Sequence, residues 1–271
     1  MTSVVDVSAR SDVGAVRHVN EDSMIAADPV FAVADGMGGH ARGDAASTTA
    51  VETLARVLPA GSLPTPDEVI AAIDEANAAV RALSGADESG IAVAGTTLAG
   101  VVRVRRPETG EEQWMVVNVG DSRVYRWDGS RLEQLSIDHS AVQELVDAGL
   151  ITTEQAAVHP ERNVITRALG AEDFVDTDVL FLPLEGRQTF LICSDGLTKE
   201  LGDAEIARIL ADSNGVSPAD ALVDAAIEAG GRDNVTVVVV ESVTGEPDAT
   251  PTDEQDEIDE SRSLEDTAPR A

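Results

Sequence analysis

The stretch MIAADPVFAVADGMGG, residues 24–39, decides how we expect this chain to fold. Its two apolar segments, 24–27 and 30–34, are separated by Asp28-Pro29, a dipeptide typical of turns. We therefore expect two neighbouring strands, the second of which carries Asp35 to the point where the backbone leaves the core. The glycines that follow Asp35 allow a sharp turn beside its carboxylate.

Three further aspartates lie close to glycine in similar surroundings. They are Asp121 in VGDSR (119–123), Asp195 in CSDGL (193–197) and Asp233 in GRDNV (231–235). Carboxylates delivered from strand ends can converge on one hard cation, because Mg²⁺ and Mn²⁺ prefer oxygen ligands. The four histidines include no pair four residues apart, so the sequence does not predict a zinc site built on one helix face.

The remaining pattern groups strands with strands and helices with helices. We expect helices over 44–58, 66–83, 141–148, 152–158, 203–211 and 218–229, and further strands over 96–104, 113–119, 123–127, 131–135, 189–193 and 235–241. Tight turns such as Asp128-Gly129 favour antiparallel pairing. This order predicts the α+β class: two antiparallel β-sheets packed as a central sandwich with helices on both outer faces.

Composition limits the number of domains and the class of protein. A chain of 271 residues with 43% hydrophobic content can bury one substantial core. We expect one folded domain over residues 1–244 and a disordered acidic tail over 245–271, where apolar residues are few and no periodicity is evident. The net charge of −31 argues against nucleic-acid binding, which needs a cationic face.

The sequence shows no sign of a membrane segment, because no window approaches the roughly 18 apolar residues that a spanning helix needs. The first residues lack the basic flank of a signal peptide, so we expect a cytoplasmic protein. Cys193 is the only cysteine, which rules out a disulfide within the chain. We expect it to be a small buried strand residue.

The aspartate motifs belong to a longer ordered series. It comprises SDVG (11–14) with Arg17, NEDS (20–23), DGMGG (35–39), GTT (95–97), NVGDSR (118–123), DHS (138–140), TRALG (166–170), SDGL (194–197) and GRDNVT (231–236). In this order the motifs resemble those of the metal-dependent PP2C-type (PPM) protein serine/threonine phosphatases, bacterial branch. Each motif alone is weak, since Asp-Gly is foremost a turn signal, but the full series is specific. The resemblance makes residues 1–244 the catalytic domain.

The resemblance implies two Mn²⁺ or Mg²⁺ ions per chain. In such a site Asp35 bridges both ions, the backbone carbonyl of Gly36 is a ligand, and Asp195 and Asp233 complete the shell of the first ion. Two ions roughly 3.5 to 4 Å apart can share a hydroxide of lowered pKa and offset charge on a transferring phosphoryl group. The implied reaction is hydrolysis of phosphoserine and phosphothreonine without a phosphoenzyme, in opposition to serine/threonine kinases.

Three further residues receive roles from the resemblance. Glu21 and Asp22 match acids that hold metal-bound water, and Arg17 matches the arginine that grips the substrate phosphate. A guanidinium suits this role because its planar fork binds phosphate oxygens in pairs. With Asp35, Asp195 and Asp233, Arg17 completes the expected catalytic set.

Two positions depart from the family pattern. Lys199 stands where many members carry an acid that helps to hold a third, weaker ion. We therefore expect such an ion to rely on Asp121, Asp195, water or residues of the family's variable flap, around 139–170. Met37 stands where some members carry histidine, which leaves water or His40 to protonate the leaving oxygen.

Other classes of function are compatible with single motifs. GMGGHA (36–41) satisfies the dinucleotide-binding fingerprint, but the helix expected after it leads into a second helix, and Asp35 would place a negative charge near a pyrophosphate. The remaining alternative is a pseudophosphatase, a regulatory module that binds phosphoproteins without turnover. For the phosphatase and for the pseudophosphatase alike, the expected partners are phosphorylated proteins, and the expected state is a monomer.

Overall fold

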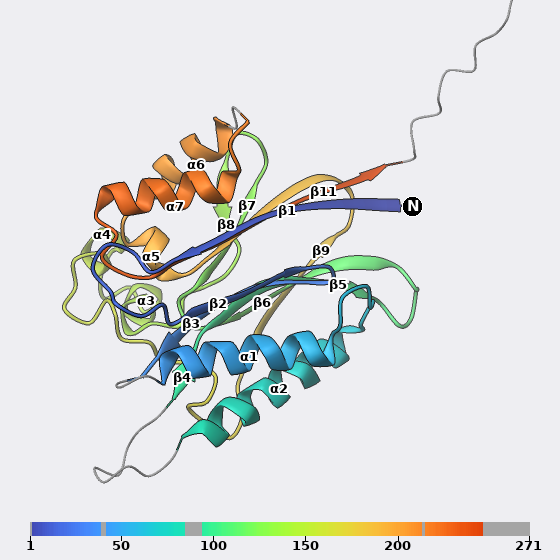
Figure 1. Ribbon diagram of the computed structural model, residues 1–271, viewed down its shortest axis with the longest axis horizontal. Helices are drawn as coiled ribbons and strands as arrows, with labels where there is room; N and C mark the ends of the chain where they lie inside the picture. The colour runs from blue at the N-terminus through green and yellow to red at the C-terminus, as the bar shows by residue number, and fades with distance from the viewer. Residues whose placement is uncertain (1, 39–41, 85–93, 213–214, 246–271) are drawn as a thin grey trace, which may run out of the picture.

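Two antiparallel sheets lie face to face with helices on both outer faces, as the computed structural model shows (Figure 1). The structure describes residues 2–38, 42–84, 94–212 and 215–245. The predicted fold class is therefore confirmed. The predicted tail lies outside the described residues except for Gly245, which ends a strand instead of opening the tail.

The first sheet has the order β1-β11-β10-β7-β8, and the second has the order β2-β3-β5-β6-β9, with β4 paired to β3. The first sheet consists of β1 (Thr2–Asp12), β11 (Val235–Gly245), β10 (Gly186–Cys193), β7 (Arg123–Trp127) and β8 (Leu132–Gln134). The second consists of β2 (Asp22–Ala27), β3 (Val30–Met37), β4 (Gly95–Thr96), β5 (Leu98–Arg105), β6 (Glu112–Val119) and β9 (Asp178–Pro183). All strand pairs are antiparallel, which excludes the dinucleotide-binding alternative.

Most of the helices divide between the two outer faces. The helices are α1 (Gly43–Val57), α2 (Pro66–Leu83), α3 (Ala141–Asp147), α4 (Thr153–Ala156), α5 (Asp195–Thr198), α6 (Asp203–Ala211) and α7 (Pro218–Ala229). Helices α1 and α2 cover the second sheet, and α5 to α7 cover the first (Figure 1). No helix within the described ranges combines the length and apolar character needed to cross a membrane.

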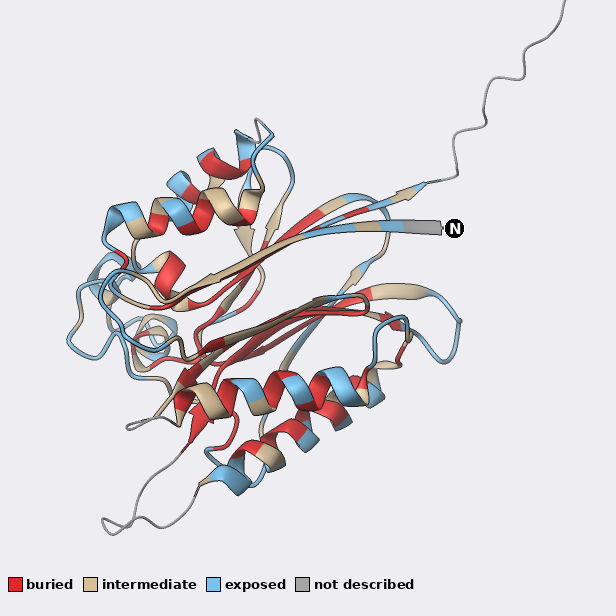
Figure 2. Cartoon of the chain, viewed as in Figure 1, coloured by how far each residue is buried: buried red, intermediate tan, exposed pale blue. Residues whose placement is uncertain are grey.

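The core has three layers, one under the helices of each outer face and one between the sheets (Figure 2). Between the sheets, the rings of Trp114 and Phe190 meet edge to face with centroids 5.4 Å apart, which is a favourable aromatic geometry. Cys193 is fully buried beneath the helices of the first sheet, as the sequence predicts. Burial also raises the pKa of its thiol to about 12.

Three elements and several element boundaries differ from the prediction. Strands β1 and β9 and helix α5 were not predicted, because the strands depend on partners far along the chain and α5 is a single turn. Asp35 lies inside β3 instead of after it, because the strand continues to Met37 by pairing with β4. Asp195 is the first residue of α5.

Candidate active site

Asp22 and Asp35 are delivered by β2 and β3, where they are register partners. Partners on an antiparallel pair place their side chains on the same face of the sheet. The backbone of Asp35 is fixed from the other side by the Thr96-Thr97 pair: the Thr97 hydroxyl accepts from the Asp35 amide at 2.9 Å, and the Thr96 hydroxyl donates to the Asp35 carbonyl at 2.9 Å.

Gly36 is a position where only glycine fits. A Cβ there would stand 2.0 Å from the carbonyl oxygen of Gly43 and 2.5 Å from that of Glu21. Both contacts are with backbone, which cannot rotate away as a side chain can. The Gly36 amide donates to the Glu21 carbonyl at 3.1 Å, so the start of α1, the end of β3 and the residue before β2 meet at this point.

The first sheet contributes Asp195 and Asp233. Asp195 follows β10 at the start of α5, and Asp233 lies in the loop that leads into β11. The two sheets are joined at the site by the Ser194 hydroxyl, which donates to Asp22 Oδ2 at 2.7 Å. This bond brings carboxylates from both sheets into one cluster.

Asn234 ties the loops around the cluster together. Its Oδ1 accepts from the Glu21 amide at 2.9 Å, and its Nδ2 donates to the carbonyls of Val13 and Val19, both at 3.0 Å. The segment that carries Arg17 is thus attached to the loop that carries Asp233. No role was predicted for Asn234; its place in the GRDNVT motif, directly after the candidate ligand Asp233, was the available signal.

Two cations contact the Asp195 and Asp233 carboxylates. Arg17 Nη2 lies 2.9 Å from Asp233 Oδ1. Lys199 Nζ forms an ion pair with Asp195 Oδ2 and a second with Asp233 Oδ2 at 3.3 Å. Burial opposes the charge of Lys199, but its two acidic partners outweigh burial and raise its pKa.

Burial and mutual repulsion favour protonated carboxyls in the cluster. Burial raises the pKa of Asp35 well above its ordinary value, and the charges of Asp22, Asp195 and Asp121 raise it further. Burial likewise raises the pKa of Asp22 to about 6 and raises that of Asp195, although Lys199 counteracts the shift at Asp195. Burial also raises the pKa of Glu21. Perturbed acids gathered in this way mark a functional site.

Asp121 joins the cluster from the turn between β6 and β7. Only 8% of the residue is exposed, and its Oδ1 has no hydrogen-bond partner. Burial, together with the charges of Asp195 and Asp138, raises its pKa to about 7. Behind it the Gly120 amide donates to His139 Nδ1 at 3.0 Å, which makes His139 a structural residue and not a ligand for this cluster.

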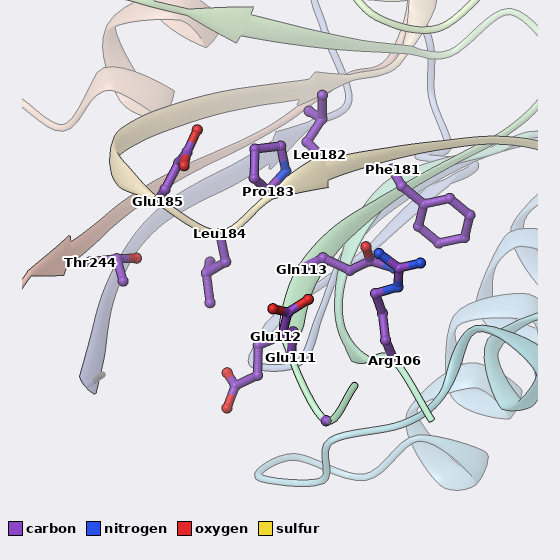
Figure 3. Close-up of a pocket in the computed structure, with 11 residues that line it drawn as sticks. Arg106, Glu111, Glu112, Gln113, Phe181, Leu182, Pro183, Leu184, Glu185 and Thr244 are labelled. Atoms are coloured by element: carbon purple, nitrogen blue, oxygen red, sulfur yellow. The ribbon is translucent and has the colours of Figure 1, made fainter. Parts of the chain in front are cut away.

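A cavity of about 720 Å³ adjoins the cluster. It lies between α3, α4 and α5, and its lining includes Asp121, Asp195, Asp233 and Lys199. A second groove of about 700 Å³ lies elsewhere, beside Phe181 and Leu184 (Figure 3). It contains none of the candidate site residues, so the chemistry belongs to the first cavity.

The donor set suits a hard divalent cation. It consists of carboxylate and carbonyl oxygens, and the buried Oδ1 atoms of Asp22 and Asp121 have no hydrogen-bond partner, as oxygens intended for an ion or its water would. Among the described residues no three acidic, histidine or cysteine side chains form a ready-made cation cage. His40, which was predicted as one alternative for protonating the leaving oxygen, and Gly39 lie outside the described residues.

Comparisons with known proteins agree with this geometry. Residues 16–226 match the family model for protein phosphatase 2C. A serine/threonine phosphatase of Listeria welshimeri is 37% identical over 86% of this chain and 94% of its own length. The PPM Ser-Thr phosphatase MsPP of Mycobacterium smegmatis, solved with cacodylate, is 39% identical, with a TM-score of 0.75 over 87% of this chain and 97% of that one.

A further solved structure is the catalytic domain of the phosphatase PstP in complex with two manganese ions. It is 36% identical, with a TM-score of 0.75, and the match covers 90% of this chain and 100% of that one. Sequence motifs, four-layer fold and family match therefore agree: this chain belongs to the protein phosphatase 2C family.

Proposed function

We propose that this protein is a metal-dependent phosphatase that hydrolyses phosphoserine and phosphothreonine in proteins. The observation that carries the proposal is the convergence of Asp22, Asp35 and Asp195 from two different sheets, with each pKa raised by burial. Burying several carboxyls side by side is costly, and bound cations offset that cost. The manganese ions of PstP support Mn²⁺ or Mg²⁺ as the cations.

Each candidate residue has a proposed role that follows from its place in the site. Asp35, Asp195 and Asp233 would provide oxygens for one ion, and Asp35 and the Gly36 carbonyl would provide oxygens for a second. Bound divalent ions supply a water of lowered pKa and offset phosphoryl charge. Glu21 and Asp22 would hold metal-bound water at the edge of this cluster. Asp121 is proposed as the main support of a third, weaker ion.

Arg17 is the proposed phosphate clamp. Its side chain is 49% exposed, and in the structure it pairs with Asp233, so it stands at the boundary between the carboxylates and solvent. From there its guanidinium can bind two oxygens of a substrate phosphate, which fixes the phosphorus relative to the cluster. The adjoining cavity leaves room for the peptide that carries the phosphate.

The cellular setting remains a prediction. We infer phosphorylated proteins as substrates and serine/threonine kinases as the opposing enzymes, in agreement with the names of the related phosphatases. A cytoplasmic location, a monomeric state and an acidic tail beyond Gly245 are expectations from the sequence alone.

The test is hydrolysis of a phosphothreonine peptide with Mn²⁺, with chelator, and with Asp35→Asn. Activity should require the metal and should fall by several orders of magnitude in the variant, whereas Glu205→Gln on the outer surface of α6 should behave as wild type. Full activity in chelator would refute the proposal. Tight binding of the phosphopeptide by the wild type without turnover would favour the pseudophosphatase.

A further inference from the structure

Lys199 is the only lysine in a chain that has eighteen arginines. This single ammonium lies in the carboxylate cluster, at the C-terminal end of α5, one turn after Asp195. It contacts Asp195 and, at 3.3 Å, Asp233. The one compact, flexible cation of the protein therefore stands between the two carboxylates assigned to the first metal ion.

The position of Lys199 is fixed by its neighbours. Glu200 accepts three hydrogen bonds from Arg232: from the backbone amide at 3.0 Å and from Nε and Nη2, both at 2.9 Å. The Glu200 side chain is only 2% exposed. This clamp joins the end of α5 to the loop that carries Asp233, so the backbone holds Lys199 within reach of both carboxylates.

We propose that Lys199 is a tethered cation that balances Asp195 and Asp233 in the metal-free protein and competes with the divalent ion for them. The inference rests on the function proposed above and concerns how that site is regulated. A lysine suits the role because its four-carbon stem lets the ammonium move away, whereas a guanidinium fork would remain locked to a carboxylate. The side chain is 36% exposed, which leaves a path to solvent.

The competition has two opposite consequences, one for the stability of the metal-free protein and one for its affinity for the metal. Without metal, the ammonium offsets repulsion between acids that would otherwise face each other in a partly buried site. With metal, the same ammonium must be displaced from Asp195 and Asp233 before both carboxylates can bind the ion. The chain therefore gains stability when empty and loses affinity for the metal, which raises the metal concentration at which the site fills.

The test compares Lys199→Gln with Arg208→Gln, which removes an equal charge from the exposed surface of α6. Calorimetric titration with Mn²⁺ should show roughly tenfold tighter binding for Lys199→Gln, as expected for removal of a nearby like charge. Arg208→Gln should stay within about twofold of wild type. Unchanged or weaker Mn²⁺ binding by Lys199→Gln would overturn the inference.

Thermal melting provides the second arm. In chelator, Lys199→Gln should melt below the wild type, and in saturating Mn²⁺ the difference should shrink or reverse. A third measurement uses the wild type and needs no variant. After reductive ¹³C-methylation, the NMR signal of the single lysine should shift when Mg²⁺ is added. A signal that does not move would contradict displacement of the Lys199 ammonium.

These measurements separate the inference from the proposed function, because none of them requires turnover. If the wild type hydrolyses phosphopeptide but binds Mn²⁺ as tightly as Lys199→Gln does, only the proposal that Lys199 competes with the metal is refuted. If the wild type has no activity but Lys199→Gln binds Mn²⁺ more tightly than it does, only the proposed phosphatase function is refuted.

Discussion

Asp22 and Asp35 stand opposite each other on the antiparallel strands β2 and β3, with both carboxyls in the same cluster. The charge of Asp22 is the second cause, after burial, of the raised pKa of Asp35. Two ionised carboxyls in this arrangement repel each other unless a cation lies between or beside them. The sheet register itself thus makes the metal-free site sensitive to pH.

The metal-free protein should lose stability as pH rises. The pKa of Asp22 is raised from 3.8 to about 6 and that of Asp121 from 3.8 to about 7, so the folded state holds these protons more tightly than the unfolded chain. The free energy of unfolding should therefore fall between pH values of about 4 and about 7. Melting in chelator should show a lower Tm at the upper end of this range, and Asp22→Asn should reduce the slope.

Saturating Mn²⁺ should reverse that pH dependence, because the ion binds deprotonated carboxylates and its affinity grows as they ionise. Tm in Mn²⁺ should rise over the same pH interval. If Tm changed with pH in the same way in Mn²⁺ and in chelator, these acids would not be the metal ligands.

Gly36→Ala should damage both folding and activity. The new Cβ would meet two backbone carbonyls at 2.0 and 2.5 Å, and the resulting overpacking should cost about 3 kcal/mol of unfolding free energy. Gly202→Ala is the matched control, since a Cβ there has no atom within 4 Å. Urea denaturation measures both variants, and equal stability of the two would contradict the close approach.

Asn234→Ala should cost activity as well as stability. Loss of its three hydrogen bonds should lower the free energy of unfolding by about 2 to 3 kcal/mol and loosen the Arg17 segment. Asn77→Ala provides the comparison, because Asn77 is a buried asparagine on α2 that bonds the Glu172 carbonyl and the Gly170 amide. We expect a similar loss of stability there with kcat retained, so equal loss of kcat in both would argue against a positioning role.

Arg17→Lys should raise KM for a phosphothreonine peptide by about tenfold, with a smaller effect on kcat, because the ammonium keeps the charge and loses the paired donors. Arg10→Lys is the control, since Arg10 pairs with Asp224 outside the cluster. Steady-state kinetics on both variants checks the assignment. An unchanged KM for Arg17→Lys would remove it from the phosphate site.

The sequence predicted the elements that carry local signals. Helix α2 begins and ends at the predicted residues, and its start has a capping box between Thr65 and Glu68 with proline at the first helical position. Strands β1 and β9 carry weaker local patterns, and they form because β11 and β6 offer them a backbone edge. Nothing within either segment specifies such a distant partner.

The sequence predicted which aspartates would gather, but it did not predict what their side chains contact. Aspartate motifs identified Asp35, Asp121, Asp195 and Asp233, and the structure brings them near one another. The sequence showed Lys199 only as a missing ligand, whereas the structure shows an ion pair with two of those aspartates. That contact depends on the position of α5 relative to the β11 loop, which no local pattern encodes.

The pairing of β1 with β11 has a consequence for the order of events during synthesis. Residues 2–12 leave the ribosome long before their partners, residues 235–245. Asp233 and Asn234 immediately precede that final strand. The nascent polypeptide can form its second sheet early, but it cannot assemble the carboxylate cluster until translation of the domain is nearly finished. Unfinished chains should therefore have no phosphatase activity in the cell.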